Sequence, residues 1–150
     1  MLPLIDYLDG ELVTFFDAKT QKEALTSLVD LLDQKDKLID REQFIQAILE
    51  REKIVSTGIG IGVAIPHAKL AGYEEFFIAI GIQKNQGIDW ESLDDLPVRI
   101  VLMIGGPENQ QTEYLNILSM ITQAIKEEGR RKALLKANTV EEVLAVFASV

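Results

Sequence analysis

A glycine-alternating segment that runs into a proline and the chain's only histidine limits the possible folds of this sequence. Residues 56–67 read Ser-Thr-Gly-Ile-Gly-Ile-Gly-Val-Ala-Ile-Pro-His. A glycine inside a helix costs about 1 kcal/mol relative to alanine, and a proline forces the preceding residue into extended backbone. The branched residues between the glycines favour strands. We therefore predict an extended segment here, with close backbone approaches to its neighbours.

Helical patterns lie on both sides of this segment. The pattern Thr-x-x-Glu, in which two side chains satisfy unpaired amides at a helix start, occurs at Thr20–Glu23 and Thr139–Glu142. Asp40 followed by Gln43 is a similar start signal. With apolar residues at helical spacing, these three signals predict helices over 21–34, from 41 to a frayed end near 51–53, and from 140 onwards. Apolar spacing alone predicts a long helix over 111–128, and a short basic helix is expected over 130–136.

Apolar runs predict strands over 12–16, 76–82 and 98–104, the last ended by Gly105-Gly106-Pro107. Strands and helices interleave along the chain, which predicts an α/β (α+β) fold around a mixed sheet. The 150 residues are the size of one ordinary domain, and no linker or repeat divides them. We therefore expect a single domain over 1–150.

Composition excludes several kinds of site. The chain has no cysteine and one histidine, which excludes disulfides, zinc-thiolate and iron–sulfur sites, a cysteine nucleophile and a site with several histidine ligands. Its net charge of −9 is opposite to the basic surface that a nucleic-acid binder needs, and it suits a partner with a positive patch. The sequence has no window long and apolar enough for a membrane helix and no basic leader, so we expect a cytoplasmic protein without direct membrane insertion.

His67 is the first candidate for chemistry. One interpretation is a histidine packed in the core or a turn. The other is a neutral imidazole nucleophile, with Arg51 and Lys69 supplying positive charge to an anionic group. The glycine run likewise predicts either a closely packed strand or turn, or an anion cradle of backbone amides with the Ser56 and Thr57 hydroxyls beside His67.

The remaining candidates have simpler interpretations. Asp94-Asp95 and Glu127-Glu128 are expected to be solvated charges in a loop and at a helix end. Trp90 is expected to be a half-buried loop anchor, and Tyr114 to be a packing residue on the long helix. No pair of carboxylates is spaced for acid–base catalysis.

A longer pattern contains the glycine segment. Arg51-Glu52 is followed by Ser56-Thr57-Gly58-Ile59-Gly60 and then by Val63-Ala64-Ile65-Pro66-His67-Ala68-Lys69. In this order and spacing, the sequence strongly resembles the enzyme IIA domain of the fructose/mannitol/nitrogen class. These domains belong to the bacterial phosphoenolpyruvate-dependent sugar phosphotransferase system (PTS). The resemblance extends over essentially the whole chain.

The resemblance implies a mixed sheet of about five strands flanked by helices, and a phosphotransferase component without metal or cofactor. His67 would accept a phosphoryl group from the phosphohistidine of the carrier HPr, with Arg51 stabilising charge. The group would then pass to an enzyme IIB or serve as a regulatory signal that controls partner proteins. The residues expected to bind the phosphoryl group or a partner are Ser56, Thr57, Gly58, Ile61, Gly62, Lys69 and Tyr114. Partners would dock on apolar residues around His67, such as Ile59 and Ile61.

Two positions depart from the family pattern. Many members have a second histidine where this chain has Tyr114, whose hydroxyl can donate a hydrogen bond but cannot be cationic. Members also usually have a polar residue where this chain has Ile61. Both changes remove polar groups near the site, so an alternative function is a binding module of the same fold that regulates a partner without phosphotransfer.

Overall fold

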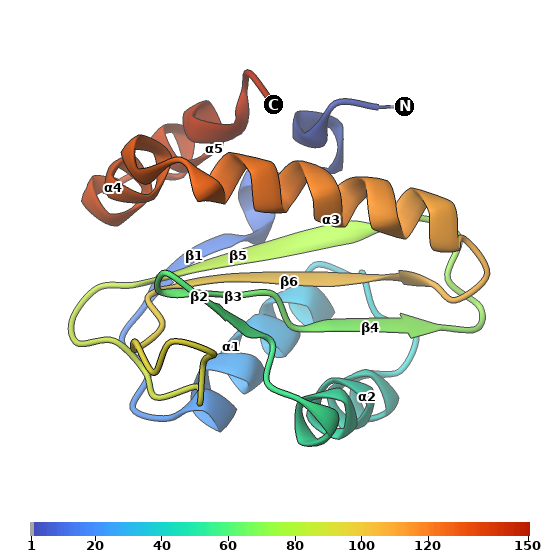
Figure 1. The fold of residues 1–150 in the computed structure, drawn as a ribbon. Coiled ribbons are helices and arrows are strands. Elements are labelled where there is room, and N and C mark those ends of the chain that lie inside the picture. Colours follow the sequence, from blue (N-terminus) through green and yellow to red (C-terminus); the bar gives the residue numbers. More distant parts are fainter. Residues whose placement is uncertain (1) are drawn as a thin grey trace.

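A mixed sheet lies between two layers of helices (Figure 1). The computed structural model describes residues 2–150. The sheet has six strands in the order β1-β5-β6-β3-β2, with β4 also paired to β6. β5–β6 and β2–β3 are antiparallel, and the other pairs are parallel. The strands are β1 (Val13–Phe16), β2 (Gly58–Gly60), β3 (Val63–Ala64), β4 (His67–Leu70), β5 (Phe77–Gln83) and β6 (Ile100–Pro107).

Helices α1 and α2 cover one face of the sheet, and α3, α4 and α5 cover the other (Figure 1). The predicted helix starts are confirmed, because Thr20, Asp40 and Thr139 each accept a hydrogen bond from the amide three residues on. The helices are α1 (Gln21–Gln34), α2 (Arg41–Ile54), α3 (Gln111–Lys126), α4 (Glu128–Lys136) and α5 (Val140–Phe147), and two short 3-10 turns, η1 (Leu4–Tyr7) and η2 (Gly10–Leu12), precede β1.

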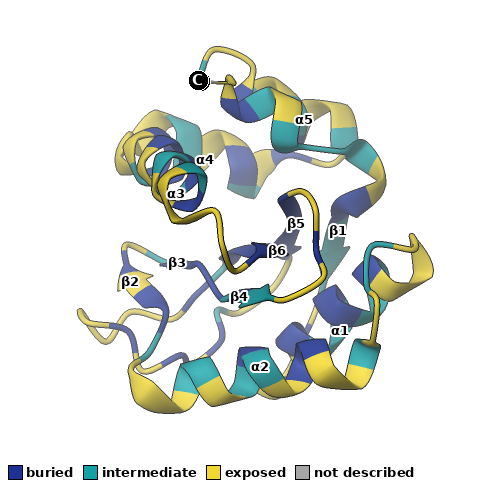
Figure 2. Ribbon diagram, turned by 90° about the vertical axis from the view of Figure 1, so that its right-hand side faces the viewer, coloured by how far each residue is buried: buried dark blue, intermediate teal, exposed yellow. Residues whose placement is uncertain are grey.

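The central strands are buried on both faces, as Figure 2 shows for β5 and β6. Their side chains alternate between two clusters, because successive residues of a strand point to opposite faces. Ile80 and Leu102 pack toward α3, α4 and α5, whereas Ala79 and Met103 pack toward α1 and α2. The α/β prediction with a mixed sheet is therefore confirmed.

Several boundaries differ from the predictions. Residues 10–12 form η2, so the first strand begins only at Val13. The glycine segment supplies three short strands rather than one, which raises the strand count above the expected five. α2 continues to Ile54 without the predicted fraying near 51–53, because Arg51 donates from Nη1 to the carbonyl of Val55 at 2.8 Å and so caps the last turn.

The Gly105-Gly106-Pro107 sequence does not end β6, because these residues pair with β4. Glycine is needed there for a close approach. A Cβ on Gly105 would lie 2.5 Å from the ring of Phe77, and one on Gly106 would lie 2.3 Å from the ring of Phe76.

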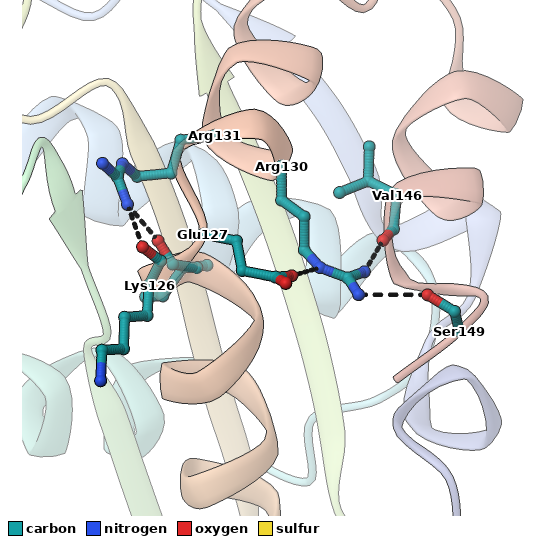
Figure 3. A network of polar contacts seen from close by, with 7 residues as sticks. Lys126, Glu127, Arg130, Arg131, Val146 and Ser149 are labelled. Carbon is teal, nitrogen blue, oxygen red and sulfur yellow. Dashed lines mark hydrogen bonds and ion pairs between the residues drawn. The ribbon is translucent and has the colours of Figure 1, made fainter.

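The predicted long helix ends at Lys126, and the basic helix α4 follows after a break at Glu127. Two arginines of α4 stabilise neighbouring helix ends (Figure 3). Arg131 donates from Nη1 to the carbonyls of Ile125 at 2.7 Å and Lys126 at 2.9 Å. Arg130 bonds Glu127, the carbonyl of Val146 and the hydroxyl of Ser149. Cationic groups at helix C-termini satisfy free carbonyls and the helix dipole.

The two ends of the described chain meet. The amide of Leu4 donates to the carbonyl of Val150 at 3.3 Å, and Figure 1 draws both ends above the α3 side of the sheet.

Candidate functional site

His67 begins strand β4 at an edge of the sheet, between the two helical layers. The amide of Ile104 in β6 donates to the carbonyl of Pro66 at 2.9 Å, which fixes the backbone directly before the histidine. β3 and β4 pair with successive parts of β6, and residues 65–66 connect them. The half-buried imidazole can therefore contact α2 on one side and α3 on the other.

Both ring nitrogens of His67 have a partner. Nδ1 lies 3.2 Å from the carbonyl oxygen of Ile65, and since a carbonyl only accepts, this assigns the proton to Nδ1. Nε2 lies 3.2 Å from Nε of Arg51, which donates to it. The arrangement defines a neutral imidazole whose lone pair is on Nε2, facing a guanidinium.

The surroundings lower the pKa of His67 below its ordinary value of 6.5. Burial is the largest cause, and the positive charges of Arg51 and Lys69 act in the same direction. The hydrogen bond to the carbonyl of Ile65 opposes them by favouring the protonated ring. The imidazole is therefore neutral at pH 7, and its Nε2 lone pair accepts the hydrogen bond from Arg51.

Tyr114 packs against the other side of the histidine. The two ring centroids are 5.4 Å apart, and Nζ of Lys69 lies 4.1 Å from the centroid of the Tyr114 ring. Lys69 also donates from Nζ to the side chain of Gln111 at 2.5 Å, next to the start of α3. Burial is the main cause that raises the pKa of the Tyr114 hydroxyl. Tyr114, at the position where the resemblance implies a histidine in many members, is thus a buried, neutral packing partner of His67.

A cleft of about 530 Å³ opens beside the histidine, between the end of α2 and the start of β4. We call it the His67 cleft. Arg51, Lys53 and Lys69 line it, and Glu50 is the one acidic residue among its lining residues. The exposed side chain of Ile54 adds an apolar wall. An excess of positive charge around a neutral nucleophile suits an anionic group.

The Ser56 and Thr57 hydroxyls are engaged away from His67. Ser56 donates to the backbone carbonyl of Trp90 at 2.6 Å and accepts from the amide of Gly58 at 3.0 Å. Thr57 donates from its hydroxyl to Glu52 and accepts from the Trp90 indole at 3.3 Å. These groups stabilise the start of β2 rather than forming the cradle that the sequence suggested. Trp90, expected to be half-buried, is only 1% exposed.

Sequence reasoning missed the role of Glu52. Its carboxylate accepts from the hydroxyl and amide of Thr57 and from Nε2 of Gln21 at 3.0 Å, and so joins α1, α2 and the start of β2. Glu52 directly follows Arg51, so the same contacts hold the turn of α2 from which Arg51 reaches His67. The Arg51-Glu52 pair in the motif was the available signal.

The turn between β2 and β3 has left-handed backbone at three consecutive residues, with φ of 95° at Gly60, 53° at Ile61 and 79° at Gly62. The amide of Ile61 donates to Asp94 at 2.8 Å. That bond and a second one from the amide of Leu96 lower the pKa of Asp94, so this carboxylate, expected to be simply solvated, holds the turn. Ile59 and Ile61 are 38% and 42% exposed.

Within residues 2–150, no group of three or more His, Cys, Asp or Glu side chains is placed to hold a metal ion. Over the same residues, none of the helices has the length and apolar character needed to cross a bilayer.

Comparisons with known proteins identify the family of the chain. A sequence model of the family described as "Phosphoenolpyruvate-dependent sugar phosphotransferase system, EIIA 2" matches residues 6–150. The chain is 33% identical over 141 residues to a PTS system fructose-specific EIIA component of Haloferax volcanii, covering 93% of this chain and 91% of that protein. It is 38% identical over 131 residues to a PTS system fructose-specific EIIABC component of Bacillus subtilis, covering 87% of this chain but only 20% of that longer protein.

Solved structures have the same fold. The nitrogen regulatory protein IIA-Ntr of Neisseria meningitidis superposes with a TM-score of 0.89 at 25% identity, covering 97% of this chain and 99% of that chain. Enzyme IIAMTL in its complex with phosphorylated enzyme IIBMTL from Escherichia coli has a TM-score of 0.81 at 22% identity, covering 95% and 98%. At that identity the second likeness establishes the fold alone.

Proposed function

The chain belongs to the EIIA 2 family of the phosphoenolpyruvate-dependent sugar phosphotransferase system, and we propose that it is a phosphohistidine carrier whose acceptor is His67. The proposed donor is the phosphohistidine of HPr. The observation that supports this most is the state of the imidazole: Nδ1 bonds the carbonyl of Ile65, and Nε2 faces Arg51 in the cationic His67 cleft.

The proposed transfer needs only positioning and charge stabilisation. The lone pair of His67 Nε2 forms a bond to phosphorus while the phosphorus–nitrogen bond of the donor breaks. The donor ring is protonated on its other nitrogen, so it leaves with that electron pair as a neutral imidazole. His67 keeps its Nδ1 proton, and the carbonyl of Ile65 stabilises the positive charge that its ring acquires. The reaction exchanges one phosphoimidazole for another, so no further activation is required.

Arg51 is the proposed electrostatic partner of the transferred group. Its Nη1 bonds the carbonyl of Val55, and its Nε donates to His67. When phosphorus approaches Nε2, the guanidinium can turn its N–H groups from the imidazole to the phosphoryl oxygens. Lys69, 4.1 Å above the Tyr114 ring, can add a second positive charge from the opposite side.

Two kinds of recipient fit the relatives. One relative is named as a fructose-specific EIIA component, and a structural neighbour was solved with a phosphorylated enzyme IIB. Another neighbour is named as a nitrogen regulatory protein. We propose transfer to an enzyme IIB or phosphorylation-dependent binding of a regulated protein. Docking would use exposed apolar side chains, including Ile54, which lines the cleft, and Ile59 in β2. An exchange with HPr also implies a cytoplasmic location.

The test is intact-protein mass spectrometry at alkaline pH, after incubation with phosphoenolpyruvate, enzyme I and HPr. We expect one acid-labile phosphoryl group on the wild-type chain and none on His67→Ala. An isotope-labelled two-dimensional NMR spectrum of His67→Ala checks that the variant is folded. Arg51→Ala should still be phosphorylated, but about 100-fold more slowly, since losing one preorganised charge donor commonly costs that much.

Equal labelling of wild type and His67→Ala would overturn the acceptor assignment. No labelling of the wild type, with HPr itself phosphorylated and several HPr proteins tried, would overturn phosphotransfer in favour of a regulatory binding module. In that case a pull-down with unphosphorylated chain and an enzyme IIB or regulated protein would become the informative measurement.

A further inference from the structure

A second cleft, of about 230 Å³, lies beside the β2–β3 turn. We call it the α4 cleft. It is bounded by that turn, by residues 97–100 and by α4. Ile61, Pro97 and Leu135 give it apolar walls. Its volume is below the roughly 300–1,000 Å³ of sites for drug-sized ligands, so an occupant would be small.

The charges of the α4 cleft contrast with those of the whole chain. Arg99, Arg131 and Lys132 line it, and Glu128 is the only acidic lining residue, which gives a local charge of +2 in a chain of net charge −9. Three of these four residues belong to the basic helix α4, which has no part in the proposed phosphotransfer. The lining of the His67 cleft includes no residue of the α4 cleft.

The arginines of the α4 cleft have unused donors. Nε of Arg99 is buried and has no hydrogen-bond partner among residues 2–150, although its Nη2 bonds the carbonyls of Gln83 and Lys84. Arg131 is held by Nη1 on the end of α3, and Figure 3 shows the rest of its guanidinium turned away from Arg130. A buried donor without an acceptor destabilises the chain, so pairing it with an acceptor is favourable.

From these observations we propose that the α4 cleft binds a small organic phosphate. A local charge of +2 matches a phosphate monoester, which has about −1.5 to −2 charge at pH 7. Arg131 is bonded through Nη1 alone among residues 2–150, so its Nε and Nη2 suit a bidentate contact to phosphate oxygens. Arg99 adds a fixed positive charge, and Lys132, exposed and 3.2 Å from Glu128, adds a second one at the rim. The apolar walls accommodate a short carbon skeleton. A simple inorganic ion would leave those walls without a contact.

The site borders the segment that leads to His67. The carbonyl of Gly62 accepts from the amides of Arg99 and Ile100, and β3 follows directly after it. A ligand in the α4 cleft therefore touches the turn that begins the path through β3 to His67, while it leaves the His67 cleft open. The proposal itself concerns binding and does not depend on phosphotransfer.

The experiment is an NMR titration of the ¹⁵N-labelled chain with glycerol 3-phosphate at low ionic strength, without enzyme I or HPr. We expect shifts at the amides of Ile61, Gly62, Arg99 and Lys132. Glycerol should cause none, and inorganic phosphate should bind the same amides more weakly. Lys132→Gln should lower the affinity of the chain for glycerol 3-phosphate by about two- to fivefold. Glu128→Gln should raise that affinity by a similar factor, as expected for exposed charges.

The matched control is Lys136→Gln, which makes the same charge change on α4 at a residue outside the lining of the cleft. Its affinity should equal that of the wild type. Lys132, Glu128 and Lys136 are all exposed, so the three variants should fold alike. Shifts confined to the His67 cleft, equal affinities in all variants, or no shifts at all would overturn the proposal.

Discussion

The bond between Arg51 and His67 occupies the lone pair that must attack phosphorus. Nε of Arg51 donates to Nε2 of His67 at 3.2 Å, so phosphoryl acceptance requires this bond to break. The proton on Nδ1 needs no change, because its carbonyl partner on Ile65 serves both the free and the phosphorylated ring. Arg51 therefore changes partner during the proposed reaction, whereas the backbone around His67 stays fixed.

The pKa of His67 should depend on Arg51. We expect Arg51→Gln to raise this pKa, because the change removes a positive charge beside the ring, but to leave it below 6.5, because burial is the larger cause. The chain's single histidine makes the NMR titration of its Cε1 proton unambiguous. Lys53→Gln is the control, since Lys53 lines the cleft without contributing to the shift. A titration midpoint that does not move in Arg51→Gln would contradict this account.

Individual side-chain partners were predictable only in part. His67 and Arg51 could be paired from the motif, although 16 residues separate them. The hydrogen bonds of Ser56 to Trp90 and of Thr57 to Glu52 could not be predicted, because the relative positions of these segments depend on the whole fold. The same is true of Trp90, which lies in a polar stretch of sequence yet packs in the apolar cluster that faces α1 and α2.

Among the elements, helix starts were predictable and sheet pairing was not. The three capped helices begin where their side-chain signals stand, because capping is a contact between near neighbours in the sequence. The glycine segment was correctly expected to be extended. Its division into β2, a left-handed turn, β3 and β4 depends on pairing with β6, which lies more than 30 residues further along the chain.

The left-handed turn predicts an unusual stabilising substitution. Ile61 has φ of 53°, which is strained for a branched side chain, and its side chain is 42% exposed. Ile61→Gly should raise the free energy of unfolding by roughly 0.5–1 kcal/mol, since relief of strain exceeds the entropy that glycine adds to the unfolded chain. Urea denaturation followed by circular dichroism measures this.

The control for that substitution is Ile59→Gly. Ile59 has a similar exposure but lies in β2 with ordinary extended backbone, so glycine should destabilise the chain there. If both variants lose stability equally, the turn is not strained.

The contacts of Glu52 join three elements, and their loss should affect both stability and transfer. Glu52→Gln should lower the free energy of unfolding by about 1–3 kcal/mol, because a neutral amide cannot accept all the bonds from Thr57 and Gln21. It should also slow phosphoryl acceptance by His67, because the turn that holds Arg51 shifts. Urea denaturation curves measure the change in the free energy of unfolding, and single-turnover labelling measures the rate of phosphoryl acceptance.

Glu50→Gln makes the same charge change on an exposed residue of α2 and separates charge from hydrogen bonding. We expect wild-type stability and nearly wild-type labelling from it. A Glu52→Gln variant that is destabilised but transfers at the wild-type rate would confine Glu52 to a purely structural role.

For the whole molecule, a sheet covered by helices on both faces was predictable from the apolar runs and the helical patterns that interleave along the chain. Continuous burial along β5 and β6 requires cover on both faces, and the helices before and after them provide it. The strand order was not predictable from residue patterns alone, because they do not say which edge a short strand joins. The family resemblance predicted a mixed sheet flanked by helices. The structure adds that His67 lies at an edge of this sheet, between the helices that cover its two faces.

The lowered pKa of His67 links its titration to the stability of the whole chain. The unfolded chain binds a proton near pH 6.5, while the folded chain binds it only at lower pH, so the unfolded state holds more protons between these values. Stability should therefore fall as pH drops from about 7 through this window, with a slope of at most about 1.4 kcal/mol per pH unit. Below the folded pKa this contribution levels off.

His67→Gln removes this contribution. The unfolding free energy of the wild type minus that of His67→Gln should decrease as pH falls through the window. Urea denaturation of both proteins at several pH values measures this difference. A difference that stays constant from pH 7 downwards would mean that the pKa of His67 is not lowered.

The meeting of the chain ends has a consequence for how this fold can be embedded or rewired. Because the amide of Leu4 bonds the carbonyl of Val150, the backbone is nearly a closed loop. A short peptide joining those ends should give a circular permutant, with new termini opened between exposed Asn85 and Gln86 and the strand order intact. If the fold were inserted into a longer polypeptide, the segments before and after it would attach side by side. A force that pulled these two segments apart would act first on the hydrogen bond between Leu4 and Val150.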